Sequence, residues 1–180
     1  MSERDFRVIV TGPNLAPAAI KEISGFGAKL EFMEEPITEN DLLKIISGRR
    51  TDAIILRGNP PLTGRVIEST HGLKVISKHG AGIDTIDVGT ATKRGVVVVL
   101  TGGTNAAAVA EMTIALMFAL GRDIVRLDTR LKQGYWERGA YVGRELRGRM
   151  LGIIGFGQIG RRVAEAARAL GLEVVAWSRR

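Results

Sequence analysis

The sequence predicts an α/β protein built from two parallel-sheet domains. Short apolar runs alternate with helical patterns through roughly the first hundred residues, and a G-x-G-x-x-G run near the end stands between an apolar strand and a helix. Strands that alternate with helices favour a parallel sheet with helices on both faces. We therefore expect a flavodoxin-like domain over residues 1–100 and the first half of a Rossmann domain over residues 101–180.

The first domain is expected to contain strands joined by helices. Apolar runs that are typical of strands lie at residues 6–11, 28–32, 52–56, 73–77 and 95–99. Apolar spacing that is typical of helices lies at residues 15–24, 39–47 and 62–69. Pro13 and Pro17 help to start the first of these helices, because proline is tolerated in the first turn of a helix.

The second domain is expected to open with two helices. Residues 104–120 are apolar on nearly every face, which is typical of a helix buried between layers. Glu111 in this helix would then need hydrogen-bond partners, because burial of an unpaired carboxylate is costly. Residues 122–133 have one apolar side, and an arginine- and glycine-rich loop follows them.

The glycine run lies in the context of a strand–helix–strand unit. Residues 150–155 have an apolar strand pattern, and residues 158–170 have a helical pattern that Gly171 ends. Residues 173–177 have the pattern of a second strand. A lone G-x-G-x-x-G is weak evidence, but in this context it predicts dinucleotide binding.

Each glycine of the run has its own expected role. Gly155 permits the tight turn, Gly157 lets the backbone approach a pyrophosphate, and Gly160 lets helix and strand pack closely. The amides around Gln158 and Ile159 would face the phosphates at the positive end of the helix. The alternative is an ordinary glycine-rich turn that binds no nucleotide.

The residues after the last strand indicate which nucleotide is bound. In NAD-binding units an Asp or Glu near this place accepts hydrogen bonds from the ribose, but here the place falls at Ser178, followed by Arg179 and Arg180. A carboxylate would repel a 2′-phosphate, whereas a hydroxyl and a guanidinium can bind one. The expected cofactor is therefore NAD(P), with NADP favoured. The alternative is that both arginines are simply solvated.

Composition argues against a membrane protein or a disulfide-rich protein. The chain has no cysteine, and its hydrophobic content of 45% is ordinary for a globular domain. No run reaches the ~20 apolar residues of a membrane helix. The N-terminus lacks the pattern of a signal peptide, so we expect a cytoplasmic protein.

The charge distribution argues against nucleic-acid binding. The net charge of +7 arises in residues 121–180, which hold 13 Lys+Arg and 6 Asp+Glu. These basic residues are spread over several elements, and aromatic residues make up only 5% of the chain. Stacking platforms for bases are therefore lacking, and we expect no nucleic-acid partner.

A second glycine-rich motif follows the fourth expected strand. Residues 78–87 read Lys-His-Gly-Ala-Gly-Ile-Asp-Thr-Ile-Asp. Ligands of open parallel sheets bind beyond the carboxyl ends of the strands. Gly80 and Gly82 would leave backbone amides there free to hold a carboxylate.

Four motifs in this order resemble the D-isomer-specific 2-hydroxyacid dehydrogenases, and among them the phosphoglycerate dehydrogenases. They are residues 78–87, residues 105–111, the loop with Trp136 and Glu145-Leu146, and residues 151–160. The resemblance implies an oxidoreductase that transfers hydride between NAD(P) and a D-2-hydroxy acid. It also implies that the first domain binds this small acid and that the second binds the nucleotide.

The resemblance implies which residues meet the substrate. Arg57 matches an arginine that faces the substrate, and Lys78 falls where phosphoglycerate dehydrogenases often have arginine. The remaining matches are Gly80, Ala81 and Gly82, whose amides hold the substrate carboxylate, and Asn105, a polar contact near the hinge. Arg57 as a surface ion pair is the alternative, and Lys78 lacks the bidentate fork of arginine.

The resemblance also implies which residues meet the cofactor. Val109 and Thr113 match positions that line the nicotinamide, while Gln158 and Ile159 match contacts to the pyrophosphate. Ser178 departs from the family, which usually has an acidic residue there, and this puts specificity for NAD in doubt.

The family's catalytic arginine, its acidic partner and its histidine are expected beyond Arg180. The 180 residues alone are therefore expected to be inactive, since general acid–base catalysis is typically worth ~10² to 10⁴ in rate. Two alternatives are a nucleotide-sensing or corepressor-type protein without turnover and an inactive truncated product. Because the family's dimers are built through the second domain, we also expect a homodimer.

Overall fold

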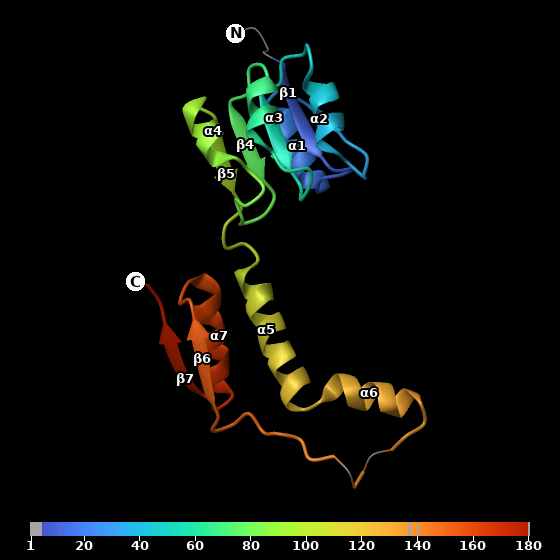
Figure 1. Cartoon of the computed structure of the whole chain (residues 1–180), viewed down its shortest axis with the longest axis vertical. Coiled ribbons are helices and arrows are strands. Elements are labelled where there is room, and N and C mark those ends of the chain that lie inside the picture. The colour runs from blue at the N-terminus through green and yellow to red at the C-terminus, as the bar shows by residue number, and fades with distance from the viewer. Residues whose placement is uncertain (1–4, 137, 140, 180) are drawn as a thin grey trace. The chain divides into compact units, whose positions relative to one another are not determined.

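The chain folds into two compact units, Met1–Gly102 and Gly103–Arg180 (Figure 1). This computed structural model describes residues 5–136, 138–139 and 141–179. Each unit has its own sheet. That the first unit binds the substrate and the second the nucleotide stays a prediction.

The strands of the first unit form one parallel sheet in the order β2-β1-β3-β4-β5. They are β1 (Phe6–Thr11), β2 (Ala28–Phe32), β3 (Ala53–Leu56), β4 (Val75–Lys78) and β5 (Val97–Leu100). This is the flavodoxin-like strand order, so the predicted fold class is confirmed. The register pairs Leu56 with Lys78, which brings the carboxyl ends of β3 and β4 level with each other.

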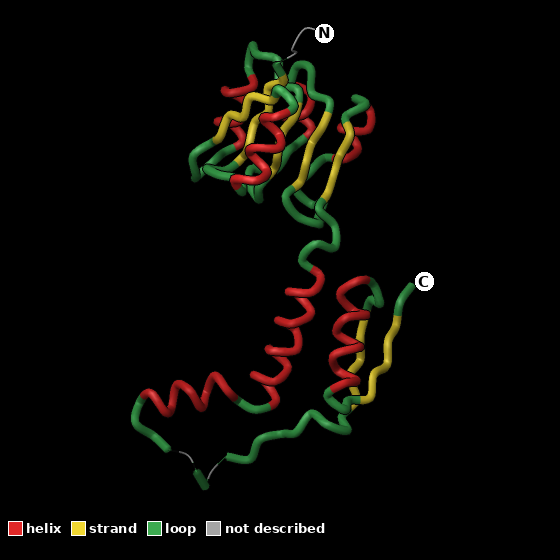
Figure 2. The backbone as a smooth tube through the Cα atoms, turned by 180° about the vertical axis from the view of Figure 1, so that it is seen from behind, coloured by secondary structure: helices red, strands yellow, loops and turns green. Residues whose placement is uncertain are grey.

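Helices flank the sheet of the first unit, as the backbone trace in Figure 2 shows. They are α1 (Pro17–Gly25), α2 (Glu39–Ile46), α3 (Gly64–Ser69) and α4 (Val88–Lys93). Leu42 of α2, Ile67 of α3 and Ala91 of α4 join strand residues such as Ile54 and Ile76 in a single core. Burial of apolar surface contributes about 25 cal/mol per Å², so this core is the main source of the unit's stability.

Helix α4 lies in a segment for which the sequence predicts no helix. Its start is held by Asp87, whose carboxylate accepts hydrogen bonds from the backbone N–H of Thr90 at 2.9 Å and from Thr90 Oγ1 at 2.8 Å. These two hydrogen bonds lower the pKa of Asp87. The cap therefore contributes fully above the ordinary pKa of the carboxyl and is lost as the pH falls through the lower folded value. The segment has weak helix propensity, so the cap and the burial of Ala91 decide its structure.

The second unit contains a two-stranded parallel sheet and three helices among its described residues. Its elements are α5 (Ala106–Gly121), α6 (Ile124–Lys132), β6 (Met150–Ile154), α7 (Gln158–Ala169) and β7 (Glu173–Trp177). Helix α7 connects the parallel strands β6 and β7, and α5 packs against α7. This βαβ unit is the predicted first half of a Rossmann sheet.

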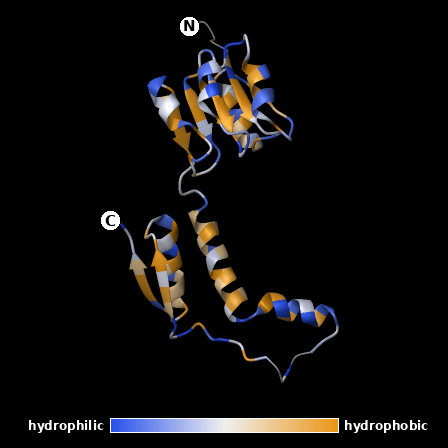
Figure 3. Ribbon diagram, viewed as in Figure 1, coloured by the Kyte–Doolittle hydropathy of each residue, from blue (hydrophilic) through white to orange (hydrophobic). Residues whose placement is uncertain are grey.

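Helix α5 is less buried than its composition predicts. Figure 3 shows apolar residues along its whole length. Only Ala106 and Ala110 of this helix are buried, whereas Met112 and Leu116 are 60% and 61% exposed. Glu111 is also exposed, so the predicted burial of its carboxylate is wrong. The reason is that α7 covers only one side of α5 among the described residues.

None of the described helices combines the length and the hydrophobicity that a bilayer-crossing segment requires.

Candidate functional site

The carboxyl edge of the first sheet brings together Arg57, Lys78 and the glycine-rich loop, all of which are predicted to meet a substrate. Strand β1 lies between β2 and β3, so the chain departs from β1 and β3 in opposite directions along the sheet. Such a switch point is where open parallel sheets bind ligands. Arg57 follows β3 directly at this point, and Lys78 ends the neighbouring strand β4.

Arg57 is oriented by the end of β1 and the loop that follows it, which lie across the switch point. Its backbone N–H donates to Thr11 Oγ1 at 2.9 Å. Its Nη1 donates both to the main-chain oxygen and to the Oδ1 of Asn14, each at 2.5 Å. The side chain also lies close to Gly12, where a Cβ atom would stand 3.3 Å from Arg57 Cδ. The predicted position of Arg57 as a residue facing a ligand crevice is thus compatible with the structure.

Lys78 is a buried cation. Only 8% of the residue is exposed, and its Nζ donates to Thr85 Oγ1 at 2.8 Å. In the part of the chain that the structure describes, neither Lys78 nor Arg57 forms an ion pair. A buried ammonium without a carboxylate partner favours an anionic ligand, because burial of an uncompensated charge is costly.

The glycine-rich loop after β4 offers fewer free amides than its sequence predicts. The N–H of Gly80 is already engaged, since it donates to Thr101 Oγ1 and to the main-chain oxygen of Lys78, each at 2.9 Å. Ala81 and Gly82 are exposed, and within the described residues their N–H groups donate to no protein acceptor. The amides available to a carboxylate are therefore those of Ala81 and Gly82.

A groove of about 710 Å³ adjoins Arg57. It is lined by residues 35–38 of the loop after β2, by Glu39 at the start of α2, and by residues 57–61, which follow β3. Pro36, Ile37 and Pro60 supply apolar walls, and Glu35 and Glu39 supply carboxylates. The groove gives a bound acid room beside Arg57.

The second unit contains the glycine turn predicted to hold a pyrophosphate. Gly155 has φ +95°, a conformation that L-residues with side chains rarely adopt. A Cβ at Gly160 would stand 2.3 Å from the oxygen of Gly155, so only glycine allows α7 to pack this closely on the turn. A Cβ at Gly157 would meet nothing within 4 Å, which leaves open space in front of the start of α7. The geometry agrees with the turn role of Gly155 and the packing role of Gly160, while the approach of a pyrophosphate at Gly157 stays a prediction.

The start of α7 carries the other predicted phosphate contacts. Gln158 and Ile159 are its first residues, and both are exposed. Arg161 was not singled out from the sequence, yet its Nε donates to the oxygen of Phe156 at 3.2 Å, so its guanidinium lies beside the turn. The free N–H groups and the dipole of a helix start attract phosphate. The exposed start of α7 and the guanidinium of Arg161 are therefore compatible with binding the pyrophosphate of a dinucleotide.

The end of β7 lies next to the glycine turn. The N–H of Gly155 donates to the oxygen of Trp177 at 2.8 Å, so Ser178 and Arg179 leave the sheet beside the turn. Both are exposed, as a contact to a ribose or to its 2′-phosphate requires. Arg180 lies outside the described residues.

The remaining predicted contacts lie on α5. Asn105 is the exposed N-cap residue, and its side chain makes no capping hydrogen bond. Val109 is 37% exposed, and Thr113 Oγ1 donates to the oxygen of Val109 at 2.8 Å. Arg57, Lys78 and residues 80–82 of the predicted substrate set thus lie in the first unit, whereas Asn105 lies in the second unit with the predicted cofactor contacts.

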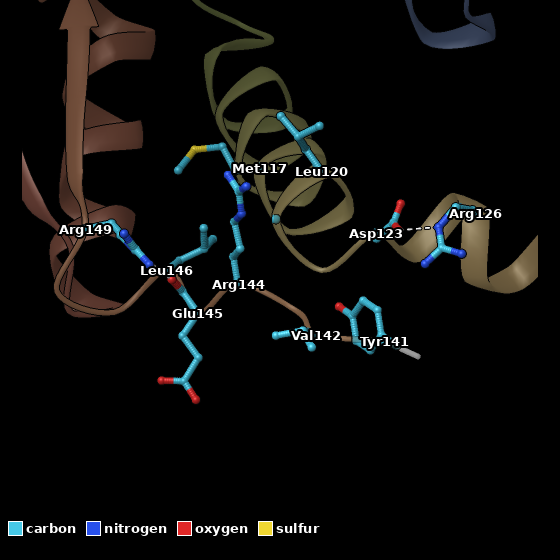
Figure 4. Close-up of a pocket in the computed structure, with 11 residues that line it drawn as sticks. Met117, Leu120, Asp123, Arg126, Tyr141, Val142, Arg144, Glu145, Leu146 and Arg149 are labelled. Atoms are coloured by element: carbon cyan, nitrogen blue, oxygen red, sulfur yellow. Dashed lines mark hydrogen bonds and ion pairs between the residues drawn. The ribbon is translucent and has the colours of Figure 1, made fainter. Parts of the chain in front are cut away.

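A larger hollow in the second unit contains none of the predicted ligand contacts. This hollow of about 760 Å³ lies between the end of α5 and the loop that leads to β6. Figure 4 shows the side chains that line it. Met117 and Leu120 line it from α5, and Arg144 lines it from the loop. Asp123 and Arg126 at its rim form an ion pair at 2.5 Å.

No group of three or more described His, Asp and Glu side chains is arranged to hold a metal ion. The groups present at these sites are cations, backbone amides and a helix start, all of which can bind anions.

Comparison with known proteins identifies the family. The family model described as "D-isomer specific 2-hydroxyacid dehydrogenase, catalytic domain" matches residues 8–176. The chain belongs to this family.

Individual relatives agree with this assignment. A hydroxypyruvate reductase of Thermotoga maritima is 40% identical over 149 residues, which are 83% of this chain and 48% of that protein. A 3-phosphoglycerate dehydrogenase of Entamoeba histolytica, solved with NAD⁺, has a TM-score of 0.75 and 27% identity and matches 98% of this chain and 55% of that one. An acyclic imino acid reductase, solved with NADPH and D-Arg, has a TM-score of 0.84 and 27% identity and matches 95% of this chain and 55% of that one. The chain thus spans about half the length of these proteins.

Proposed function

We propose that this chain supplies the substrate-binding unit and the first half of the nucleotide-binding unit of an NAD(P)-dependent D-2-hydroxyacid dehydrogenase of the phosphoglycerate dehydrogenase type. The observation that carries the proposal is the carboxyl edge of the first sheet, where Arg57 and Lys78 form no ion pair among the described residues. The hydroxypyruvate reductase and the phosphoglycerate dehydrogenase among the relatives support a 2-oxo or 2-hydroxy acid as substrate.

The residues of this chain bind and orient the acid. The free amides of Ala81 and Gly82 hold its carboxylate, and the guanidinium of Arg57 and the ammonium of Lys78 attract its negative charge. A bound nicotinamide would supply the hydride, while the protein supplies orientation. The N–H groups at the start of α7, with Gln158 and Ile159, would hold its pyrophosphate, and Val109 and Thr113 would line its nicotinamide.

Loss of the Arg57 guanidinium is expected to weaken binding of the acid. Arg57→Gln should raise the dissociation constant of oxamate, an inert analogue of a 2-oxo acid, by about tenfold, because a hydrogen bond to a charged group contributes about 1.5–3 kcal/mol. Titration of the chain's amide NMR spectrum measures this constant, with Arg65→Gln on the exposed side of α3 as the control. Equal affinity of Arg57→Gln and wild type would contradict the assignment.

The 180 residues by themselves are expected to bind ligands without turnover. None of their residues is assigned to the orientation of the keto group or to proton exchange, and general acid–base catalysis accounts for a factor of ~10² to 10⁴. The purified chain, mixed with NADPH or NADH and hydroxypyruvate, should oxidise the cofactor no faster than a boiled sample. Oxidation above that background would show that the chain contains a complete catalytic set.

We further propose that the nucleotide is NADP(H), on the argument from Ser178 and Arg179. Ser178→Asp together with Arg179→Pro should weaken NADPH binding relative to NADH by about tenfold, since a carboxylate repels the 2′-phosphate and a charge-assisted bond is lost. Nicotinamide fluorescence measures both dissociation constants, and Arg168→Gln near the end of α7 is the control. Tighter binding of NADH than of NADPH by the unaltered chain would refute the preference.

We also propose that two copies of the chain associate through the second unit. Met112, Leu116 and Leu120 of α5 are 60–86% exposed, and Trp136 in the following loop is 74% exposed. Apolar surfaces of this kind are rarely left uncovered in globular proteins. Light scattering should report a dimer or aggregates at micromolar concentration. Leu116→Glu should lower the average molecular mass that this measurement gives. A stable, non-aggregating monomer of the unaltered chain would exclude this association.

A further inference from the structure

The two cations at the carboxyl edge of the first sheet are held by neutral oxygen atoms. Arg57 donates to the main-chain oxygen and Oδ1 of Asn14 at 2.5 Å, and Lys78 donates to Thr85 Oγ1 at 2.8 Å. None of these acceptors carries a formal charge. Both side chains are thus oriented while their positive charges stay uncompensated by any ion pair among the described residues.

Cations at the opposite edge of the same sheet are held differently. Arg7 forms an ion pair with Glu31 at 2.7 Å, and Arg50 forms one with Asp52 at 2.6 Å. Both arginines lie near the amino ends of the strands, where no ligand is expected. The contrast shows that this fold can pair its arginines with carboxylates, and that the pairing is absent at the edge where Arg57 lies.

The bonding pattern also selects which edge of the Arg57 guanidinium is available. Both hydrogen bonds to Asn14 start from Nη1. Among the described residues, Nε and Nη2 donate to no protein acceptor. These two nitrogens form one of the two parallel-donor edges with which arginine binds a carboxylate bidentately.

We propose that Asn14 is a positioning residue for substrate binding. Its amide oxygen fixes Nη1, so that the Nε–Nη2 edge is presented to the carboxylate or another anionic group of the substrate at full positive charge. The proposal rests on the proposed function, in which Arg57 faces the acid, and it assigns a role to a residue of the loop after β1. Asparagine is required there because aspartate would hold the guanidinium equally well but would cancel its charge.

The charge requirement makes Asn14→Asp the decisive variant. It keeps an oxygen acceptor in place and adds one negative charge next to Arg57. An extra negative charge bound to Nη1 of the same guanidinium should weaken oxamate binding about three- to tenfold. Thermal stability should be unchanged or higher, because the hydrogen bond becomes an ion pair. Asn14→Ala should weaken binding less, since the main-chain oxygen still holds Nη1.

The experiment is a titration of the 180-residue chain with oxamate, followed by amide NMR, together with the thermal unfolding midpoint of each variant. Asn40→Asp, an identical change at an exposed position of α2, is the matched control and should bind like wild type. Weaker binding by Asn14→Asp without loss of thermal stability supports the proposal, because a purely structural role would move the unfolding midpoint and not the affinity.

Two outcomes overturn the proposal for Asn14. Only the second of them also overturns the proposed role of Arg57. If Arg57→Gln loses oxamate binding while Asn14→Asp binds like wild type, Asn14 has no positioning role and the proposed function stands. If Arg57→Gln also binds like wild type, or if wild type binds no oxamate, the substrate assignment of Arg57 fails and the role of Asn14 fails with it.

Discussion

The parallel direction of every strand in the first sheet is the constraint on which the candidate substrate site depends. Because the strands share one direction, the loops after β1, β3 and β4 all leave the sheet at the same edge. Residues separated by more than forty positions, such as Asn14 and Arg57, therefore come within hydrogen-bond distance. Helices α2, α3 and α4 fix this arrangement by burying one apolar core against the strands. The edge can then present cations without carboxylate partners.

The second unit depends on a close backbone contact. Gly160 allows α7 to pack directly on the turn after β6, and this contact points the start of the helix at the space in front of Gly157. The hydrogen bond from Gly155 to Trp177 brings the end of β7 beside the same turn. In the proposed function, one compact βαβ unit would thus supply both phosphate recognition and ribose recognition without a lysine.

Much of this architecture follows from sequence because its signals are local. Apolar runs identified every strand, and the glycine spacing identified the turn before α7. Helix α4 was missed because its stability comes from the Asp87 cap and from burial of Ala91, which propensity does not show. The burial of α5 was overestimated, since composition does not reveal which neighbours cover a helix. The occupied amide of Gly80 and the contact of Asn14 with Arg57 are tertiary features, and no local pattern encodes them.

The central claim is that the carboxyl edge of the first sheet binds the acid group of the substrate. A crystal structure of the chain with bound oxamate tests it most directly. The account predicts the oxamate carboxylate on the amides of Ala81 and Gly82 and within hydrogen-bond distance of Arg57 Nε and Nη2. Oxamate bound only elsewhere, for example in the hollow beside Met117 and Leu120, would contradict it.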